Sequence, residues 1–533
     1  MERFVIGVDV GTGSARAGVF AVADGARKGL ASHPIKLWRP QPEFVEQSSA
    51  DIWSAVGIAV RGALAQAKVA PESVVGMGFD ATCSLVVLGE SDVPLTVSPT
   101  GSSEQNIIVW MDHRAIAEMD AINAGSHDVL KYVGGAISPE MEPPKLQWLK
   151  KHLPETWAKA TKFLDLADFL TYKASGQDVR SLCTNVCKWT YLGHEGRWDT
   201  AFLATLGLDD PRITGNLIRP LGERIGPLTA DAAAYFGLTT GCFVAVGIID
   251  AHAGGLGLLG AANLESSIAL IGGTSNCHMA ASKDPIFVPG VWGPYFGAMV
   301  PGYWLTEGGQ SAAGALIDFV IEDSSEYRDL AYRAESEGTT VYALLNAEAQ
   351  KLADSEGLAD LAYLTRHLHV LDFHLGNRSP FADPHARGVV EGLSLDKSLA
   401  QDTRLYVATV QALAYGTRAI IEAANAKGFT ISQIVATGGG TKNPLWLQQH
   451  ADACGLPITL GRESESVLLG SAILAAHASG DYASVTDAMT AMGRAGETIA
   501  PNPATRAFHD AKYAIWRDLY DAQRRHCALM VGI

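Results

Sequence analysis

The feature that most constrains this chain is a pair of short apolar segments, each of which runs directly into a glycine–threonine turn. Residues 4–10 (Phe-Val-Ile-Gly-Val-Asp-Val) precede Gly11-Thr12-Gly13, and residues 268–271 (Ile-Ala-Leu-Ile) precede Gly272-Gly273-Thr274. Apolar, β-branched runs that end at glycine are typical of strands followed by tight turns. Because the two segments stand about half a chain length apart, we predict two halves of related design.

Helices alternate with strands along the rest of the chain. The 533 residues exceed what one hydrophobic core usually supports, so at least two domains are expected. Ser48 and Asp51 form a capping-box start for one helix, and Gly428 ends another. The main elements expected are a helix over 51–67, a strand over 74–79, a helix over 401–427, a strand over 434–437, a helix over 443–454 and a final helix with Phe508, Tyr513 and Trp516 on one face.

This alternation predicts an α/β protein with mixed sheets. The division is expected near residues 255–267, in the glycine-rich stretch that follows Asp250. We therefore predict domains of residues 1–262 and 263–533, the second of which ends in a helical tail.

The charge balance limits the partners that the chain can have. The net charge is −16, whereas a protein that neutralises the phosphates of a nucleic acid presents a basic face. The same excess of acidic residues disfavours an anionic membrane surface, and no apolar run approaches the roughly 18 residues that span a bilayer. A small phosphorylated ligand stays compatible, because backbone N–H groups and one metal ion can hold phosphates locally.

The cysteines indicate a reducing compartment. The chain has seven, an odd number without disulfide-rich spacing. Cys183 and Cys187 lie four residues apart, but no second Cys or His pair at zinc spacing accompanies them. Since the N-terminus enters a strand pattern without the features of a signal peptide, we expect reduced thiols and a cytoplasmic location.

The first candidate motif is Asp9 followed by the Gly11–Gly13 turn and Arg16. A carboxylate at a strand end beside a glycine-rich hairpin places a metal-holding group next to backbone donors that can surround a phosphate. Taken alone, the motif is also typical of an ordinary hairpin without a ligand. The Gly273-Thr274 turn has the same two interpretations, a phosphate-binding turn or a plain tight turn.

Gly438, Gly439 and Gly440 form a third glycine-rich turn, between a predicted buried strand and a helix. Three consecutive glycines are costly in chain entropy, which favours a close approach of backbone to ligand. The segment is neither a Walker A loop nor a Rossmann fingerprint. A nucleotide site of another type is therefore expected.

Asp250 ends the apolar run Val246-Gly-Ile-Ile and leads into small residues. A carboxylate at that position can face a cleft as a catalytic base, or it can cap the helix that follows. His252, two residues later, is expected to be a structural histidine.

Taken together, these motifs resemble the FGGY family of carbohydrate kinases, in the order in which that family carries them and over residues 3 to about 480. Residues 144–149 (Pro-Lys-Leu-Gln-Trp-Leu) resemble the family's first signature. Residues 388–393 (Gly-Val-Val-Glu-Gly-Leu) resemble the second, although the spacing and Arg404 depart from its usual pattern.

The resemblance implies two ribonuclease-H-like domains of the actin-type ATPase fold, with a cleft between them, together with ATP, Mg²⁺ and a small-molecule sugar as ligands. A homodimer is compatible with it. In that arrangement Asp9 holds Mg²⁺, Asp250 is the base, and Arg16 either steadies the phosphoryl oxygens or forms a surface ion pair. The ATP-binding residues implied are Gly11, Thr12, Gly13, Arg16, Gly273, Thr274, Gln310, Gly314, Gly439, Gly440 and Asn443. The sugar-binding residues implied are Thr82, Cys83, Asp112, Lys188, Asp250 and Glu307.

Within the family, residues 78–87, 110–114, 187–190 and 290–296 look most like the D-ribulokinase branch. Glycerol kinases, by resemblance, carry an Arg-Glu pair where Cys83-Ser84 stands here. The resemblance thus implies phosphorylation of D-ribulose to D-ribulose 5-phosphate. A kinase for L-ribulose, xylulose or ribitol stays open, as does, in another class, an actin-like ATPase switch or a non-catalytic sugar-binding regulator.

Overall fold

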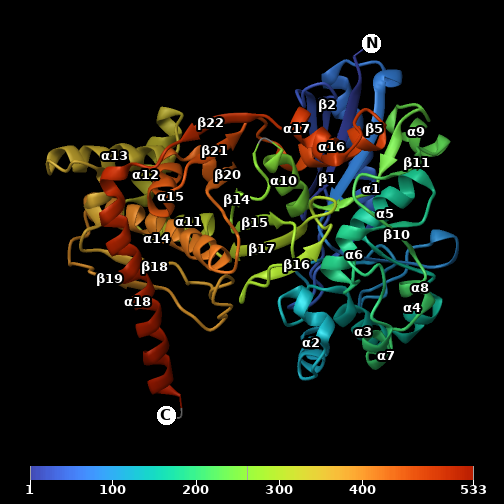
Figure 1. The fold of residues 1–533 in the computed structure, drawn as a ribbon, viewed down its shortest axis with the longest axis horizontal. Coiled ribbons are helices and arrows are strands. Elements are labelled where there is room, and N and C mark those ends of the chain that lie inside the picture. Colours follow the sequence, from blue (N-terminus) through green and yellow to red (C-terminus); the bar gives the residue numbers. More distant parts are fainter. Residues whose placement is uncertain (1, 261, 532–533) are drawn as a thin grey trace.

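The computed structural model describes residues 2–260 and 262–531, which form two halves side by side (Figure 1). Each half is built on a seven-stranded mixed sheet. In the part of the chain that the structure describes, no helix is long and apolar enough to cross a membrane.

The first sheet has the order β11-β12-β5-β1-β2-β3, and β13 also pairs with β5. β1 runs antiparallel to β2 and parallel to β5, so the strand of the first glycine–threonine turn is central. The strands are β1 (Phe4–Val10), β2 (Ser14–Ala21), β3 (Arg27–Pro34), β5 (Val74–Ala81), β11 (Arg224–Pro227), β12 (Phe243–Ala245) and β13 (Ile248–Ile249).

The second sheet has the order β16-β17-β15-β14-β20-β21-β22. Its central strand, β14, runs antiparallel to β15 and parallel to β20. The strands are β14 (Ser267–Gly272), β15 (Asn276–Ser282), β16 (Trp292–Phe296), β17 (Trp304–Gln310), β20 (Gln433–Gly438), β21 (Ile458–Gly461) and β22 (Ala495–Ile499). The two sheets share one plan around the strand that ends in a glycine–threonine turn, which confirms the expected relation between the halves.

The first sheet is covered on both faces by helices. α1 (Ser49–Ala67) packs on one face, with Ile6 and Val8 of β1 in the same apolar cluster as its buried side. α16 (Ser466–Ala478) packs on the other, where a Cβ added to Gly7 would lie 2.0 Å from the Leu468 carbonyl oxygen. Glycine at this position lets the α16 backbone lie directly on the strand.

α16 comes from the second half of the sequence, and with α17 (Val485–Met492) it lies beside α10 (Asp250–Leu259) against the first sheet (Figure 1). The polypeptide therefore crosses back to the first half after β21. For that reason a single division at residue 262 stays a prediction.

Smaller elements extend each half. In the first they are β4 (Glu46–Gln47), β6 (Leu85–Leu88), β7 (Ile107–Ile108), β8 (Lys162–Asp165), β9 (Val179–Ser181), β10 (Leu217–Arg219), α2 (Ile116–Asn123), α3 (Glu142–His152), α4 (Pro154–Lys159), α5 (Leu166–Ser175), α6 (Leu182–Lys188), α7 (Thr200–Thr205), α8 (Pro211–Thr214) and α9 (Ala230–Phe236). In the second they are β18 (His369–Leu371), β19 (Val389–Glu391), α11 (Gly314–Glu322), α12 (Tyr327–Glu337), α13 (Val341–Ser355), α14 (Leu399–Asn425), α15 (Pro444–Cys454) and α18 (Arg506–Met530).

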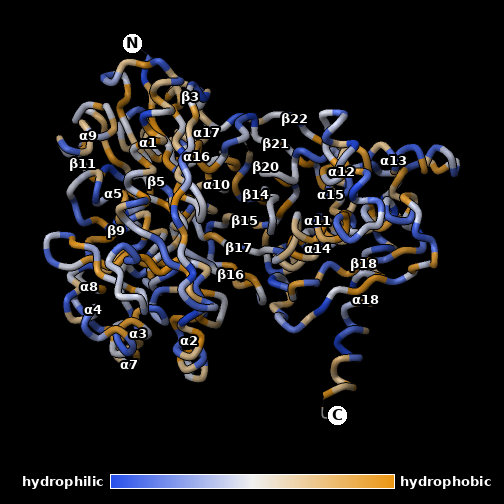
Figure 2. The backbone as a smooth tube through the Cα atoms, turned by 180° about the vertical axis from the view of Figure 1, so that it is seen from behind, coloured by the Kyte–Doolittle hydropathy of each residue, from blue (hydrophilic) through white to orange (hydrophobic). Residues whose placement is uncertain are grey.

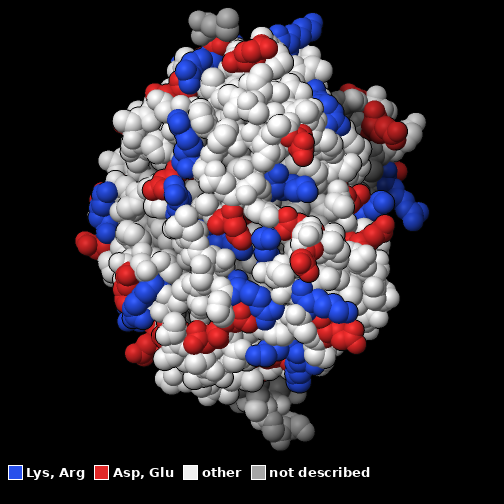
Figure 3. All heavy atoms as spheres, turned by 90° about the vertical axis from the view of Figure 1, so that its right-hand side faces the viewer, with Lys and Arg blue, Asp and Glu red and all other residues white. Residues whose placement is uncertain are grey.

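Two features predicted from local sequence signals, the capped start of α1 and the final helix, are present in the structure. The Ser48 hydroxyl accepts a hydrogen bond from the Asp51 backbone N–H at the start of α1. The last helix, α18, buries Tyr513 and Trp516, and its C-terminal turns project from the body (Figures 1 and 2). On the outer face of the first half, acidic and basic side chains are interspersed (Figure 3), so that this face carries no broad basic patch.

Candidate active site

A cavity of about 260 Å³ lies between the two halves and is lined by most of the residues predicted to bind the sugar. Five of those six residues line it, and so does Thr12 of the first turn. The predicted residues in its wall are Thr82, Cys83, Lys188, Asp250 and Glu307. The wall is completed by residues that the sequence did not single out as site residues, among them Ser138, Glu140, Trp292, Tyr295 and Arg378.

Three carboxylates come together where β1, β5 and β13 end. Asp9 and Asp80 are paired in register across β1 and β5, and Ile248 of β13 pairs with Asp80, which brings Asp250 to the same edge. Parallel strands end at one edge of a sheet, which explains the convergence. Asp80 was not predicted as a site residue, although it belongs to the Gly78–Ser84 segment on which the resemblance drew.

Two of these carboxylates, Asp80 and Asp250, have a raised pKa. Burial, and then the charge of Asp9, raise the pKa of Asp250 to about 6. The same two causes raise the pKa of Asp80 well above its ordinary value, against a 2.6 Å hydrogen bond from the Ser471 hydroxyl to Oδ2. Among the described residues, Oδ1 of Asp80 has no hydrogen-bond partner. A buried oxygen of this kind is available to a ligand or a hydrated ion.

Asp250 is the first residue of α10, and its Oδ1 accepts a 2.7 Å hydrogen bond from the adjacent Ala251 N–H. The N-cap of this helix is Ile249, so Asp250 is not the capping residue. The Asp250 side chain lines the cavity, in accord with the cleft-facing alternative.

Arg16 forms an ion pair with Asp9. Its Nε donates to Asp9 Oδ2 at 2.7 Å, and its Nη1 donates to Glu465 Oε2 at 2.7 Å. Of the two predicted roles, the structure displays the ion pair. Since the Arg16 side chain is 35% exposed, it stays within reach of a ligand beside Asp9.

The glycine-rich turns leave open backbone where the halves meet. A Cβ added at Gly13 or Gly439 would meet nothing within 4 Å. Because β14 and β20 are paired at Gly272 and Gly438, the second and third turns lie next to each other. The Gly314 N–H donates to the Gly273 carbonyl at 2.9 Å, so the start of α11 lies against the second turn. The predicted residues Gly11, Thr274 and Gly440 belong to these turns.

Two predicted ATP-binding side chains are occupied by protein partners. Asn443 caps α15 through Leu445 N–H and donates to the Tyr406 hydroxyl at 2.7 Å. Gln310 is 4% exposed and donates to Asp372 and to the Leu413 carbonyl. Their amides already have partners within the second half, and a contact of either side chain with the nucleotide stays a prediction.

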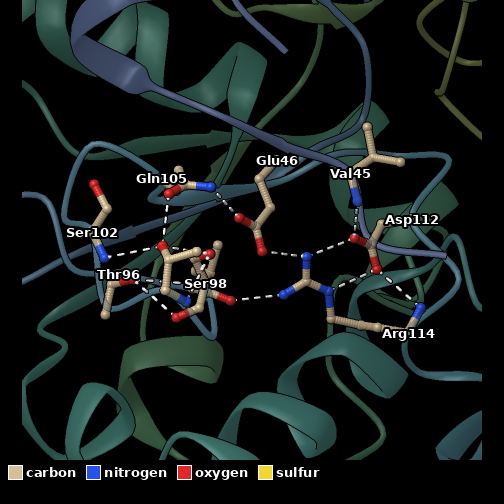
Figure 4. Close-up of polar contacts among 10 residues, drawn as sticks. Val45, Glu46, Thr96, Ser98, Ser102, Gln105, Asp112 and Arg114 are labelled. Carbon is tan, nitrogen blue, oxygen red and sulfur yellow. Dashed lines mark hydrogen bonds and ion pairs between the residues drawn. The ribbon is translucent and has the colours of Figure 1, made fainter. Parts of the chain in front are cut away.

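Asp112 is the predicted sugar-binding residue that the structure does not bring to the cavity. Its carboxylate lies in a buried network with Arg114, Glu46 and the Val45 N–H (Figure 4). Arg114 Nη2 donates to Asp112 Oδ2 at 2.7 Å and to Glu46 Oε1 at 2.8 Å, and none of the three side chains is exposed. Both Asp112 oxygens already accept hydrogen bonds that a sugar would have to displace, so a sugar contact of Asp112 stays a prediction.

A chain of polar contacts joins a buried thiol to an imidazole and a carboxylate of the cavity wall. Cys183 Sγ lies 3.2 Å from His252 Nδ1, and His252 Nε2 lies 3.2 Å from Glu307 Oε2. Burial alone would lower the pKa of His252, but Cys183 and Glu307 raise it. His252 is thus held on both nitrogens, as expected of a structural histidine.

The cations of the cavity come from both halves. Burial opposes the charge of Lys188, but Cys83 and Glu140 among its neighbours raise its pKa well above the ordinary value. The Arg378 guanidinium lies 4.6 Å from the centre of the Trp292 ring. No local pattern marks Arg378, because its neighbours in the cavity lie far away in the sequence.

Comparisons with known proteins give the family and the fold of the chain. The models of the FGGY family of carbohydrate kinases match residues 4–257 with the N-terminal domain and residues 268–479 with the C-terminal domain. A human FGGY carbohydrate kinase domain-containing protein is 46% identical over 99% of this chain and 98% of its own length. A D-ribulokinase of Saccharomyces cerevisiae is 40% identical over 92% of this chain and 74% of its own length. The crystal structure of a xylulose kinase from Rhodospirillum rubrum has the same fold, with a TM-score of 0.81 at 23% identity over 98% of this chain and 99% of the other.

Proposed function

Because the chain belongs to the FGGY family of carbohydrate kinases, we propose that it transfers the γ-phosphoryl group of ATP to the terminal hydroxyl of a pentulose, D-ribulose, and releases D-ribulose 5-phosphate. The sugar kinase class follows from family membership. The pentulose, its epimer and the mechanism are the proposal.

One observation supports the proposal: polar side chains of the kind that can bind sugar hydroxyls line the cavity together with residues of both glycine–threonine turns. Lys188, Asp250 and Glu307 lie in the same wall as Thr12 of the first turn and Ser275 of the second. At about 260 Å³ the cavity is smaller than the roughly 300–1,000 Å³ of sites for drug-sized ligands, which suits a small polar molecule. A transfer reaction needs its two ligands to meet in this way.

Asp250 is the proposed base. It accepts the proton of the terminal hydroxyl as that oxygen attacks the γ-phosphorus. A pKa of about 6 leaves it ionised at neutral pH and basic enough to take the proton. Phosphoryl transfer passes through a loose transition state, so alignment and charge neutralisation supply much of the gain.

The carboxylates fit a magnesium ion. Oxygen donors are its preferred ligands, and Asp9 lies beside Asp80, whose Oδ1 has no partner among the described residues. Asp9 would hold Mg²⁺ through water, with Asp80 next to it. When bound, the ion would neutralise charge on the phosphates of ATP.

The sugar contacts proposed are Thr82, Cys83, Lys188 and Glu307, with Asp250 at the reacting hydroxyl. Several fixed polar partners reject a wrong sugar by leaving one of their own groups unpaired. The identity to the yeast D-ribulokinase supports D-ribulose within this class.

The test is ADP release with Mg-ATP across D-ribulose, L-ribulose, D-xylulose, ribitol and glycerol. We expect D-ribulose to have the highest kcat/KM, and Asp250→Ala to abolish that preference. Asp452→Asn is the matched control, because Asp452 is a carboxylate with 1% exposure on α15, outside the cavity wall. Preference for another sugar would keep the kinase and refute the D-ribulose assignment. ATP turnover that no sugar stimulates would favour the ATPase switch or the regulator.

A further inference from the structure

Cys183, Cys187 and His252 bring three soft ligand atoms together at the edge of the cavity, and the proposed phosphoryl transfer uses none of them. Cys187 and His252 line the cavity, and Cys183 lies behind them. The two sulfur atoms and an imidazole nitrogen all lie within 4.8 Å of one another. All three side chains are buried, with exposures of 0%, 2% and 2%. Two of the ligands are one turn apart on α6, and the third is on α10.

The spacing suits a tetrahedral ion. With Zn–S and Zn–N bonds of about 2.3 and 2.0 Å, two ligand atoms of a tetrahedral site stand about 3.5–3.8 Å apart. Cys183 Sγ and His252 Nδ1 are already 3.2 Å apart. Since no two of the three ligand atoms are more than 4.8 Å apart, any separation has to close by at most about one ångström.

Glu307 supplies the outer contact that such a site needs. Its Oε2 lies 3.2 Å from His252 Nε2, which leaves Nδ1 for its contact with Cys183 Sγ. A carboxylate on the far nitrogen orients the imidazole and raises its basicity as a ligand. Since Cys183, Cys187 and His252 stand on helices, the ligand set is held by rigid elements.

We propose that Cys183, Cys187 and His252 bind Zn²⁺, and that bound Zn²⁺ competes with the sugar. Two thiolates and an imidazole select a soft cation over Mg²⁺, which prefers oxygen ligands. Three protein ligands leave a fourth tetrahedral position. Because Cys187 and His252 line the cavity beside Lys188, that position opens onto the space for the sugar. The competition rests on the proposed kinase function, but the binding does not.

The binding test uses Co²⁺ as the probe, added to reduced and chelator-free full-length protein. We expect one Co²⁺ per chain, a thiolate-to-cobalt charge-transfer band, and displacement of that band by Zn²⁺. Cys183→Ser and Cys187→Ser should lose the band, and the alanine variants give the same test if a buried hydroxyl disturbs folding. Cys277→Ser is the matched control, because Cys277 lines the same cavity and is not one of the three ligands.

Glu307→Gln should weaken Co²⁺ binding by roughly 10–100-fold, since it removes the negative charge of the outer contact and leaves the three ligands in place. Absence of a charge-transfer band in the wild-type protein, or a band that survives both cysteine substitutions, would overturn the site.

The functional test measures turnover at fixed Mg-ATP with increasing Zn²⁺. We expect Zn²⁺ to raise the KM for the pentulose, to leave kcat at saturating sugar unchanged, and to have no such effect on Cys187→Ser. Unchanged KM in a protein that binds Co²⁺ would refute the competition. A chain that binds Co²⁺ and phosphorylates no sugar would refute the proposed function and leave the metal site in place.

Discussion

Replacing Asp250 by asparagine is the change that separates a catalytic from a structural carboxylate. If Asp250 is the base, Asp250→Asn lowers kcat/KM for the pentulose by roughly 10²–10⁴, the usual loss when a positioned base is removed. In the wild type, the base is lost as pH falls through about 6, because burial and the charge of Asp9 raise its pKa to that value. The pH dependence of kcat/KM, measured by coupled ADP release, should therefore show an acid limb near pH 6 that the variant lacks.

The raised pKa of Asp250 also predicts that the Asp250→Asn variant is more stable than the wild type at neutral pH. The pKa rises from 3.8 to about 6, so the folded chain binds this proton more tightly than the unfolded chain does. The ionised carboxylate then costs stability above pH 6 and nothing below pH 3.8. A rise of about two pKa units means that the ionised carboxylate destabilises the folded protein by about 3 kcal/mol. Asparagine removes this cost, and its Oδ1 can still accept the hydrogen bond from the Ala251 N–H. Asp250→Asn should melt at a higher temperature than the wild type at neutral pH, with a difference that shrinks as pH falls through 6.

The control for the kinetic measurement is Asp452→Asn, which changes a buried carboxylate outside the cavity. It should leave the acid limb of kcat/KM in place. The reasoning is refuted if Asp250→Asn melts below the wild type at neutral pH, or if the wild-type acid limb lies near the ordinary pKa of aspartate.

Three further outcomes are expected. Arg114→Met leaves Glu46 and Asp112 buried without their cation, and should lower the free energy of unfolding by about 3–5 kcal/mol in urea titration; an unchanged midpoint would contradict the network of Figure 4. Gly78→Ala would place a Cβ 2.0 Å from the Ser471 carbonyl oxygen, so its soluble yield and melting temperature should fall sharply, whereas tolerance would mean that α16 can shift. Excess EDTA should abolish sugar-dependent ADP release, which Mg²⁺ should restore and Zn²⁺ should not; activity that survives EDTA would argue against the carboxylate metal site.

What the sequence could predict of this molecule is mostly local. Ser48 caps α1, and the glycine–threonine turns end their strands, because each signal acts within a few residues. The relation between the two sheets was also accessible, since it repeats one strand–turn pattern. Asn443 shows the limit: a helix cap and a ligand contact draw on the same residue type, and the structure displays the cap.

The parts that sequence reasoning missed depend on long-range packing. Glu140 and Arg378 meet in one cavity although 238 positions separate them, and Cys183 meets His252 across 69. The proposed zinc ligands have no signature in the sequence, because Cys183 and Cys187 have no second Cys or His pair near them along the chain. The fold supplies the third ligand from another helix.

Asp112 and Asp80 show what decides between a structural and a functional carboxylate. Each is an aspartate in a segment that resembles the D-ribulokinase branch, and neither is exposed. Asp112 has hydrogen-bond donors on both oxygens, so the cost of its burial is offset within the protein. Asp80 accepts a hydrogen bond on one oxygen only, and it lies at the same sheet edge as Asp9 and Asp250. The free-energy cost of burying its charge is therefore not offset by protein groups. A bound cation beside Asp80 would offset that cost, which is why we place the ion at this carboxylate edge and not at the Arg114 network.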